Sequence, residues 1–296
     1  MAAKLSIIVN RNGGTASKLG DKLVPTLRSA FEAAGADADV KPLDGDAVGK
    51  AIKAAAKTGR VVVAGGDGTV SCAAQQLAGS DAELGLLPLG TLNHLARDLG
   101  LPTDLEEAAK VAATGKSTAI DVAEVNGRVF VNNASIGLYP TMVRTREGLQ
   151  DDKGLPKWLS AIPAAFAALE RLPHHRLRID LGQGERSIVT PLLFVGNNVY
   201  SLDRSEIGQR ASLTDGKLSV YAVAHRSRLS LLWFAARALV GRARHDVDFV
   251  TLGECETLKV WSSGDSIEIA LDGEVQRLDS PLEFRIRPGA LKVVVG

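Results

Sequence analysis

A buried strand that runs into a glycine-rich turn limits the folds that this chain can form. The run Val61–Ala64 is apolar throughout, and Gly65–Thr69, with the sequence GGDGT, follows it at once. An unbroken apolar run is typical of a strand that is covered on both faces, as in a parallel sheet. Apolar residues at helix spacing then continue from Gly68 to Leu77, so we predict a strand–turn–helix unit.

The same alternation recurs through the first 118 residues. We predict strands at Leu5–Val9, Ala38–Leu43, Val61–Ala64 and Leu84–Leu87, and helices at Leu19–Phe31, Asp46–Lys57, Gly68–Leu77 and from about Thr91. Strands that alternate with helices form right-handed βαβ units around a parallel sheet. Residues 1–118 are therefore expected to form an α/β domain around a parallel sheet.

After about Thr118 the pattern changes to short strand-like runs. Asn126-Gly127, between Ile120–Val125 and Arg128–Ala134, is a strong hairpin signal. Further runs are Leu177–Leu181, Ser187–Val195, Leu218–Val223, Thr257–Trp261, Ser266–Leu271, Pro281–Ile286 and Leu291–Val295, and helical stretches at Lys157–Leu172 and Ser227–Val240 interrupt them. This spacing predicts an antiparallel β-sandwich or barrel over residues 119–296.

Composition narrows the classes of function. A length of 296 residues allows two cores, and the net charge of +1 argues against a nucleic-acid partner. The two cysteines, Cys72 and Cys255, lie far apart and suit a reducing compartment. No signal-peptide pattern and no apolar run of about 18 residues occurs, so we expect a cytoplasmic protein.

The glycine turn has the chemistry of a phosphate site. A helix N-terminus offers unpaired N–H groups and the positive end of a dipole, and glycines let a phosphate approach the backbone. A carboxylate at Asp67 beside a phosphate normally needs Mg²⁺ between them. Alternatively, Asp67 only caps the helix that follows it.

The turn differs from two better-known phosphate motifs. It lacks the Walker A lysine, and it half-matches the dinucleotide fingerprint with Ser71 in the place of the third glycine. That fingerprint follows a first strand, whereas this turn follows the third. Asn10, Asp67 and Thr91 all follow predicted strands, so they can converge on one ligand, although Thr91 and Asn93 are also plausible helix caps.

Two motifs together carry a family resemblance. Gly65–Thr69 with Leu89–Arg97 (LGTLNHLAR) resembles the diacylglycerol kinase catalytic-domain family, which includes bacterial soluble lipid kinases and the sphingosine and ceramide kinases. Ser135–Gly137, Leu213–Leu218 and Leu271–Glu274 match further motifs, so the resemblance covers nearly the whole chain.

The resemblance implies a fold and a site. The N-terminal domain would resemble those of NAD kinase and phosphofructokinase, a β-sandwich would follow, and the active site would lie in the cleft between them. The residues expected to bind ATP are Asn10, Gly13, Gly14, Gly65, Gly66, Asp67, Gly68, Thr69, Val70, Ser71, Thr91 and Asn93. A structural Mg²⁺ is expected at Asp215 with the carbonyls of Ser212 and Lys217, and Glu274 is the expected general base.

Two positions depart from the family pattern. Arg11 follows Asn10 where the family usually has proline, and His94 stands where many members carry aspartate. In the soluble bacterial branch that aspartate joins a water network to the structural metal. The metal site is therefore expected to differ here or to be absent.

Glu274 also fits its role on physical grounds. Asp272-Gly273 predicts a hairpin turn between Ser266–Leu271 and Val275–Leu278, and a residue just beyond a rigid turn can project into a cleft. A carboxylate there can accept the proton of a hydroxyl that attacks a γ-phosphate. The alternatives are a solvated glutamate at a strand end and, for Asp215-Gly216, a simple turn.

Two stretches could meet a membrane. Trp158–Phe166 is largely apolar, and Leu229–Val240 carries Trp and Phe between flanking arginines that include Arg226 and Arg228. Such a pattern resembles an interfacial helix, and the alternative is a helix packed on the sandwich. We predict transient binding at the inner face of the membrane.

The sequence therefore favours an ATP-dependent lipid kinase in which Asp67 and Glu274 are catalytic. A NAD kinase shares the GGDGT turn, and a Rossmann oxidoreductase or a non-catalytic nucleotide or lipid sensor are further alternatives. Diacylglycerol, sphingoid bases, ceramide and phosphatidylglycerol all offer a hydroxyl, so the lipid is not identified.

Overall fold

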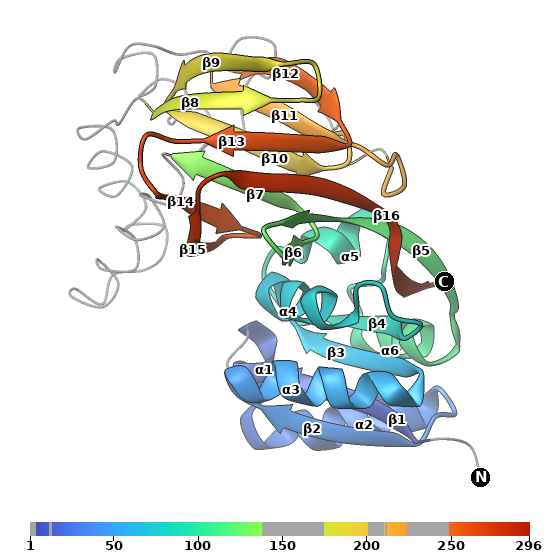
Figure 1. The fold of residues 1–296 in the computed structure, drawn as a ribbon. Coiled ribbons are helices and arrows are strands. Elements are labelled where there is room, and N and C mark those ends of the chain that lie inside the picture. Colours follow the sequence, from blue (N-terminus) through green and yellow to red (C-terminus); the bar gives the residue numbers. More distant parts are fainter. Residues whose placement is uncertain (1–3, 12–13, 138–174, 201–209, 211, 224–248) are drawn as a thin grey trace, which may run out of the picture.

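The computed structural model describes residues 4–11, 14–137, 175–200, 210, 212–223 and 249–296. It has two halves, an α/β half formed mainly by the first part of the chain and a β half formed by the rest (Figure 1). The predicted helices at Lys157–Leu172 and Ser227–Val240, the stretch Trp158–Phe166, and Gly13 lie outside the described residues.

Four parallel strands form the centre of the α/β half, in the order β2-β1-β3-β4. Its elements are β1 (Leu5–Asn10), α1 (Gly14–Leu19), η1 (Gly20–Lys22), α2 (Leu23–Ala33), β2 (Ala38–Leu43), α3 (Asp46–Ala55), η2 (Ala56–Thr58), β3 (Arg60–Gly65), α4 (Asp67–Leu77), β4 (Glu83–Pro88), α5 (His94–Asp98) and α6 (Leu105–Thr114). The predicted parallel α/β domain is confirmed.

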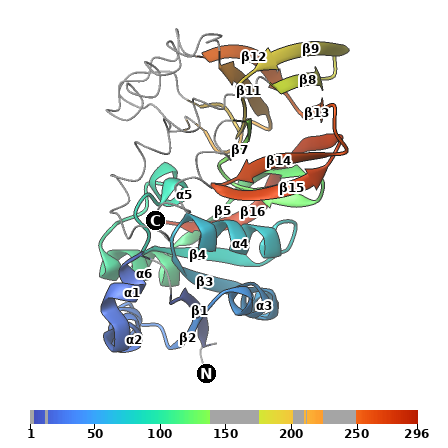
Figure 2. The same cartoon turned by 90° about the vertical axis from the view of Figure 1, so that its left-hand side faces the viewer.

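Helices cover both faces of this sheet, as Figure 2 shows from the side. Neighbouring strand residues point to opposite faces, so Ile7 packs with α1, α2 and α6 while Ile8 packs with α3, α4 and α5. Both side chains are fully buried. This double coverage explains why β1, β3 and β4 read as continuous apolar runs.

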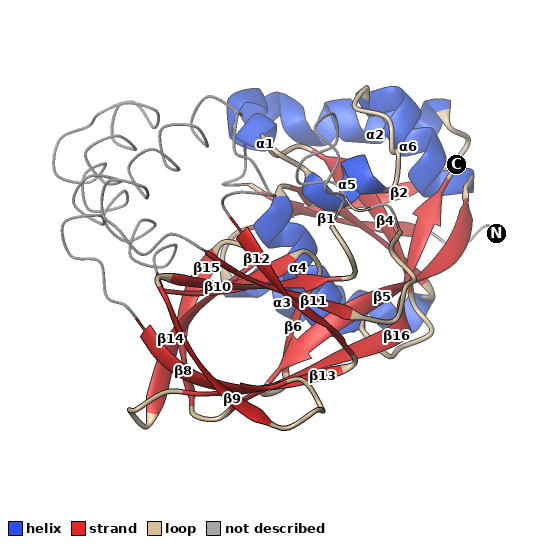
Figure 3. Ribbon diagram, turned by 90° about the horizontal axis from the view of Figure 1, so that it is seen from above, coloured by secondary structure: helices blue, strands red, loops and turns tan. Residues whose placement is uncertain are grey.

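The β half is an antiparallel sandwich, as predicted. One layer is a six-stranded sheet in the order β12-β11-β10-β7-β14-β15, and β5, β16, β13, β8 and β9 form the other (Figure 3). The strands are β5 (Lys116–Val125), β6 (Arg128–Phe130), β7 (Asn133–Gly137), β8 (His175–Asp180), β9 (Glu185–Thr190), β10 (Leu192–Asn197), β11 (Leu218–Val223), β12 (Phe249–Cys255), β13 (Thr257–Trp261), β14 (Ser266–Leu271), β15 (Glu274–Asp279) and β16 (Leu282–Val295). Phe130, Phe284 and aliphatic residues of both layers fill the space between them.

Several element boundaries differ from the prediction. The single run Ser187–Val195 is two strands, because Pro191 lacks an N–H group and separates β9 from β10. The two runs Pro281–Ile286 and Leu291–Val295 form one strand, β16, whose register shifts between Arg287 and Leu291. β12 was not predicted, because Gly253, with φ of 143°, interrupts the alternation of apolar and polar residues along it.

β16 connects the two halves. Its first residues pair with β13, and most of its length pairs with β5. Lys292 and Val293 then pair in parallel with Glu83 and Leu84 of β4. A single ten-stranded sheet therefore runs from the α/β half into the sandwich. Within the described ranges every helix is too short or too polar to traverse a lipid bilayer.

Candidate active site

A cavity of about 640 Å³ lies between the two halves, a volume that suits a nucleotide-sized ligand. Its wall comes from the end of β1, the start of α3, one side of α4 along its length, the β6 strand and the β14–β15 hairpin. The lining residues are Asn10, Gly45, Asp46, Val48, Gly66, Gly68, Thr69, Ser71, Cys72, Gln75, Gln76, Arg128, Val129, Leu271, Glu274 and Gln276. The cavity thus joins the two predicted regions that carry the glycine turn and Glu274.

The glycine turn closes tightly on the start of α4. A methyl group on Gly65 would lie 2.3 Å from Thr69 Oγ1, so only glycine fits there. The Nδ2 of Asn10 donates to Thr69 Oγ1 at 3.1 Å, which joins the end of β1 to the turn. The structure therefore brings Asn10, Gly66, Gly68 and Thr69 together at one cavity, and phosphate binding at this surface stays a prediction.

The loop after β4 packs against this turn. A methyl group on Gly90 would lie 2.4 Å from the Cα of Gly66, so the two backbones are in contact. Asn93 holds the loop, because its Oδ1 accepts from Gly90 N at 3.0 Å and its Nδ2 donates to Gly90 O at 2.9 Å. Gly14 fits against Leu89 O, where a methyl group would come to 2.4 Å, and it takes a φ of 42°. Thr91 is exposed in this loop.

Asp67 is directed at α5 rather than along its own helix. Its Oδ1 accepts from His94 N at 2.7 Å and its Oδ2 from Asn93 N at 3.1 Å. The N-cap of α4 is Gly66, with no side-chain capping bond, so the alternative that Asp67 caps α4 is not what the structure has. Asp67 instead supports the first amides of α5, and each oxygen keeps a second lone pair for another partner.

Val70 and Ser71 follow the turn within α4 and have different surroundings. The Val70 side chain packs in the core beneath the sheet, and its amide donates to Gly66 O at 3.1 Å. Ser71 lines the cavity and hydrogen-bonds to the carboxylate of Asp272. Ser71 therefore links the α/β half directly to the β14–β15 hairpin.

Glu274 is the first residue of β15 and lies against the glycine turn. Its Oε1 is 2.9 Å from the position that a methyl group on Gly68 would occupy. Although the residue keeps an exposed face, partial burial of the carboxylate raises its pKa, and the nearby charge of Asp272 raises the pKa further. A carboxylate with a raised pKa is a better proton acceptor than an ordinary glutamate.

Asp272 organises the loop opposite, a role that the sequence did not predict. Its carboxylate accepts from the amides of Val131 at 2.9 Å, Asn132 at 2.8 Å and Asn133 at 3.2 Å. Burial raises the pKa of Asp272, while these hydrogen bonds and that of Ser71 lower the pKa and offset part of the rise. Asp272 and Gly273 both have positive φ, at 47° and 92°, which suits a two-residue hairpin turn.

The Asp215 loop lies elsewhere, between Asp121 and the start of β11. Asp121 Oδ2 accepts from Gly216 N and its Oδ1 from Gly289 N, both at 2.8 Å. The carbonyl of Lys217, an expected metal ligand, accepts from Asn198 N at 2.9 Å. Among the described residues no group of three or more His, Cys, Asp or Glu side chains comes together, so a cation at Asp215, Ser212 and Lys217 would depend largely on carbonyl oxygens and stays a prediction.

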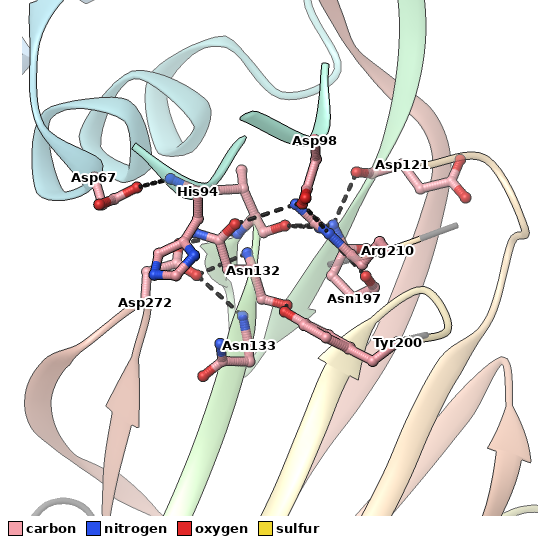
Figure 4. A network of polar contacts seen from close by, with 11 residues as sticks. Asp67, His94, Asp98, Asp121, Asn132, Asn133, Asn197, Tyr200, Arg210 and Asp272 are labelled. Atoms are coloured by element: carbon pink, nitrogen blue, oxygen red, sulfur yellow. Dashed lines mark hydrogen bonds and ion pairs between the residues drawn. The ribbon is translucent and has the colours of Figure 1, made fainter. Parts of the chain in front are cut away.

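A buried arginine, Arg210, joins the two halves (Figure 4). The sequence did not predict this role. The Arg210 side chain is fully buried, and its Nε and Nη2 contact Asp98 Oδ2 of α5 at 2.8 and 2.7 Å. Its Nη2 also donates to Asn132 Oδ1 at 3.1 Å, and its Nη1 donates to the carbonyls of Val131 and Asn197. Asp98 and Arg210 are 112 residues apart, so no local pattern predicts the pair.

Other cavity residues were missed because they look like ordinary surface positions in the sequence. Arg128 is a cation that follows the Asn126-Gly127 hairpin, and Gln75 accepts from Val129 N at 2.8 Å, which fixes α4 against β6. Cys72 lines the cavity with a pKa raised by burial and then by Glu274 and Asp46. Helix spacing placed Cys72 and Gln75 in α4 but gave no sign that they face a ligand.

Comparison with known proteins agrees with this architecture. Residues 4–125 match the family model of the diacylglycerol kinase catalytic domain, and residues 143–295 match that of the YegS C-terminal NAD kinase beta sandwich-like domain. A protein of Mycobacterium tuberculosis (strain ATCC 25618 / H37Rv) named diacylglycerol kinase is 30% identical over 265 residues, which cover 80% of this chain and 77% of the relative.

Two further comparisons extend the match. A probable lipid kinase YegS-like of Cronobacter sakazakii is 32% identical over 172 residues, about half of each chain (53% and 54%). The crystal structure of a putative diacylglycerol kinase from Bacillus anthracis str. Sterne superposes with a TM-score of 0.74 at 23% identity, over 99% of this chain and 97% of that one. That structure supports the fold, while the family models and the mycobacterial relative identify the family. The chain belongs to the diacylglycerol kinase catalytic-domain family of kinases, with a YegS-type C-terminal domain.

Proposed function

We propose that this protein is an ATP-dependent lipid kinase that transfers the γ-phosphate to the hydroxyl of diacylglycerol or a related lipid. The observation that carries the proposal is the position of Glu274, whose carboxylate lies against Gly68 at the N-terminus of α4. A proton acceptor and a phosphate-binding turn thus face one cavity from opposite halves of the molecule.

The reaction needs few parts. The α4 N-terminus and the turn at Gly66–Thr69 would bind the phosphates through backbone N–H groups. Glu274 would accept the proton of the lipid hydroxyl as its oxygen attacks the γ-phosphorus; the bond from that phosphorus to the β–γ bridging oxygen breaks, and ADP leaves. Mg²⁺ bound with the phosphates, with Asp67 as its predicted ligand, would supply charge neutralisation.

The side chains that line the cavity give less support for anion binding than the backbone of the glycine turn does. Among the described residues that line the cavity, Arg128 is the one cationic side chain, and Asp46 and Glu274 are acidic. Phosphate binding would therefore depend on backbone dipoles and on a metal ion rather than on an arginine cluster. The lipid would be met at a membrane surface, since its acyl chains do not leave the bilayer readily.

The test measures transfer of labelled γ-phosphate from ATP with Mg²⁺ into an organic-extractable product, with diacylglycerol, a sphingoid base, ceramide and phosphatidylglycerol in mixed micelles. Label in a lipid is the expected result, and Glu274→Gln should lower the rate by about 10² to 10⁴. Asp279→Asn, at the exposed far end of the same hairpin, is the matched control and should leave the rate unchanged.

A parallel tube contains NAD in place of lipid, because a NAD kinase shares the glycine turn. If only NAD becomes labelled, the protein is a NAD kinase. Nucleotide binding without transfer to any acceptor would favour a sensor, and a fully active Glu274→Gln protein would remove that residue from the reaction.

A further inference from the structure

Arg210 makes hydrogen bonds through all three nitrogens of its guanidinium. Its Nε donates to Asp98, its Nη2 to Asn132 Oδ1, and its Nη1 to the carbonyls of Val131 and Asn197. Its Nη2 also forms an ion pair with Asp98, and the ring of Tyr200 lies 5.9 Å from its Cζ. The side chain is fully buried, and that of Asp98 is 6% exposed. A planar fork with five fixed donors holds several partners in one geometry, which a lysine cannot do.

The partners of Arg210 belong to the two sides of the cleft. Asp98 ends α5, and the first amides of α5 bond to Asp67, which precedes Gly68 in the glycine turn. On the other side, the amides of Val131 and Asn132 bond to Asp272, two residues before Glu274. Arg210 therefore connects the support of the glycine turn to the support of the proposed base (Figure 4).

These contacts close into a ring. The ring runs from Asp67 through α5 to Asp98 and Arg210, then through the 131–132 segment to Asp272 and along the hairpin turn to Glu274. Glu274 Oε1 meets the surface of Gly68 and completes it. The hydrogen bond between Ser71 and Asp272 is a second connection across the same gap.

We propose that Arg210 is a positioning residue that sets the distance between Glu274 and the glycine turn by clasping α5 to the 131–132 segment. This inference rests on the proposed function, since the distance matters for phosphoryl transfer only if Glu274 is the base. Positioning of reacting groups supplies a large part of the rate in such reactions, so a small displacement of Glu274 costs activity.

The experiment compares Arg210→Lys with Arg60→Lys. Arg60 is a matched control because it also pairs with a carboxylate, Glu83, and donates to the carbonyls of Ala112, Ala113 and Gly115, but at the opposite ends of β3 and β4. We expect Arg210→Lys to lower kcat at least tenfold with KM for ATP changed less than twofold, and Arg60→Lys to leave both unchanged at a comparable loss of thermal stability. Equal kcat for the two variants would overturn the proposal.

A second readout does not need activity. In Arg210→Lys, hydrogen exchange at residues 93–98 and 272–276 should accelerate together, because both segments depend on the same clasp. Exchange that accelerates at 131–132 alone would overturn the ring. If Arg210→Lys does not fold, Asp98→Asn, which keeps the shape and removes the charge, is measured in the same way.

The two failures are distinguishable. If the wild-type protein phosphorylates none of the lipids, the proposed function is wrong. Hydrogen exchange of Arg210→Lys then still shows whether Arg210 connects the two segments. A wild-type lipid kinase whose Arg210→Lys variant keeps its kcat defeats only the clasp.

Discussion

Two Asp-Gly pairs serve the same cavity and are built differently. Asp67-Gly68 begins helix α4, and its carboxylate collects two amides that lie 26 and 27 residues further along the chain. Asp272-Gly273 forms a hairpin turn, and its carboxylate collects three amides that lie 139 to 141 residues earlier. Asp67 fixes the start of α5 beside Gly68, and Asp272 fixes residues 131–133 beside the hairpin that carries Glu274.

The two carboxylates differ in how well water can take their place. Asp67 supports a short helix at the rim, where water can replace a lost partner. Asp272 is half-buried, and desolvation of its carboxylate raises its pKa, so water would replace that carboxylate poorly if it were removed. The first pair should therefore matter mainly for activity, and the second for both activity and folding.

Removal of each carboxylate gives the largest expected contrast. Asp272→Ala leaves three N–H groups without acceptors, two of them on the buried residues Val131 and Asn132, and should lower the free energy of unfolding by about 3 kcal/mol or more. Asp67→Ala resembles the loss of a helix cap and should cost about 1 kcal/mol. Urea unfolding followed by circular dichroism measures the free energy of unfolding of both variants. Equal losses of stability would show that the two carboxylates contribute equally to folding.

Gly68→Ala acts where the helix turn and the hairpin turn approach each other, next to Glu274. A methyl group there meets only the flexible end of Glu274, at 2.9 Å. The carboxylate should move, so we expect a rate about tenfold lower, while the added alanine leaves stability unchanged or higher by about 0.5–1 kcal/mol.

Gly264→Ala is the control for that substitution, since its methyl group meets nothing closer than 3.8 Å. It should change neither rate nor stability. A Gly68→Ala protein with full activity would mean that Glu274 has room to act from another position.

The smallest expected effect is in the pH profile. A base must be ionised to accept a proton, so activity should fall as pH drops through the raised pKa of Glu274, above the ordinary value of about 4.3. Asp272→Asn removes a nearby negative charge and should move this acid limb to lower pH. The dependence of kcat/KM on pH measures the shift, and an unmoved limb would exclude electrostatic coupling between the two residues.

Local signals in the sequence predicted most of the fold. The glycine turn after a buried strand, the strand–helix alternation and the Asn126-Gly127 hairpin each depend on neighbouring residues, and each element is present. Errors occurred where a strand boundary depends on partners, as at Pro191 between β9 and β10 and at the shifted register of β16. Such boundaries are set by pairing rather than by propensity.

Part of the candidate site was also predictable from local motifs. Asn10, Gly66, Gly68, Thr69 and Glu274 line one cavity, whereas Asp67 and Thr91, which the sequence placed with Asn10, are not among its lining residues. Arg210 and Asp98 were out of reach, because a buried ion pair between residues so far apart leaves no local pattern. Asp272 was recognised only as a turn residue, since its partners at 131–133 are defined by the sandwich and not by the hairpin.

The strand shared by the two halves has a consequence for how the protein is made. β4 has β3 on one side and obtains its other neighbour, β16, from residues 292 and 293. During synthesis the α/β half therefore emerges long before the strand that covers this edge, and the edge is open to other chains in the meantime. Completion of the α/β half is thus a late event in biosynthesis, because it waits for residues 292 and 293.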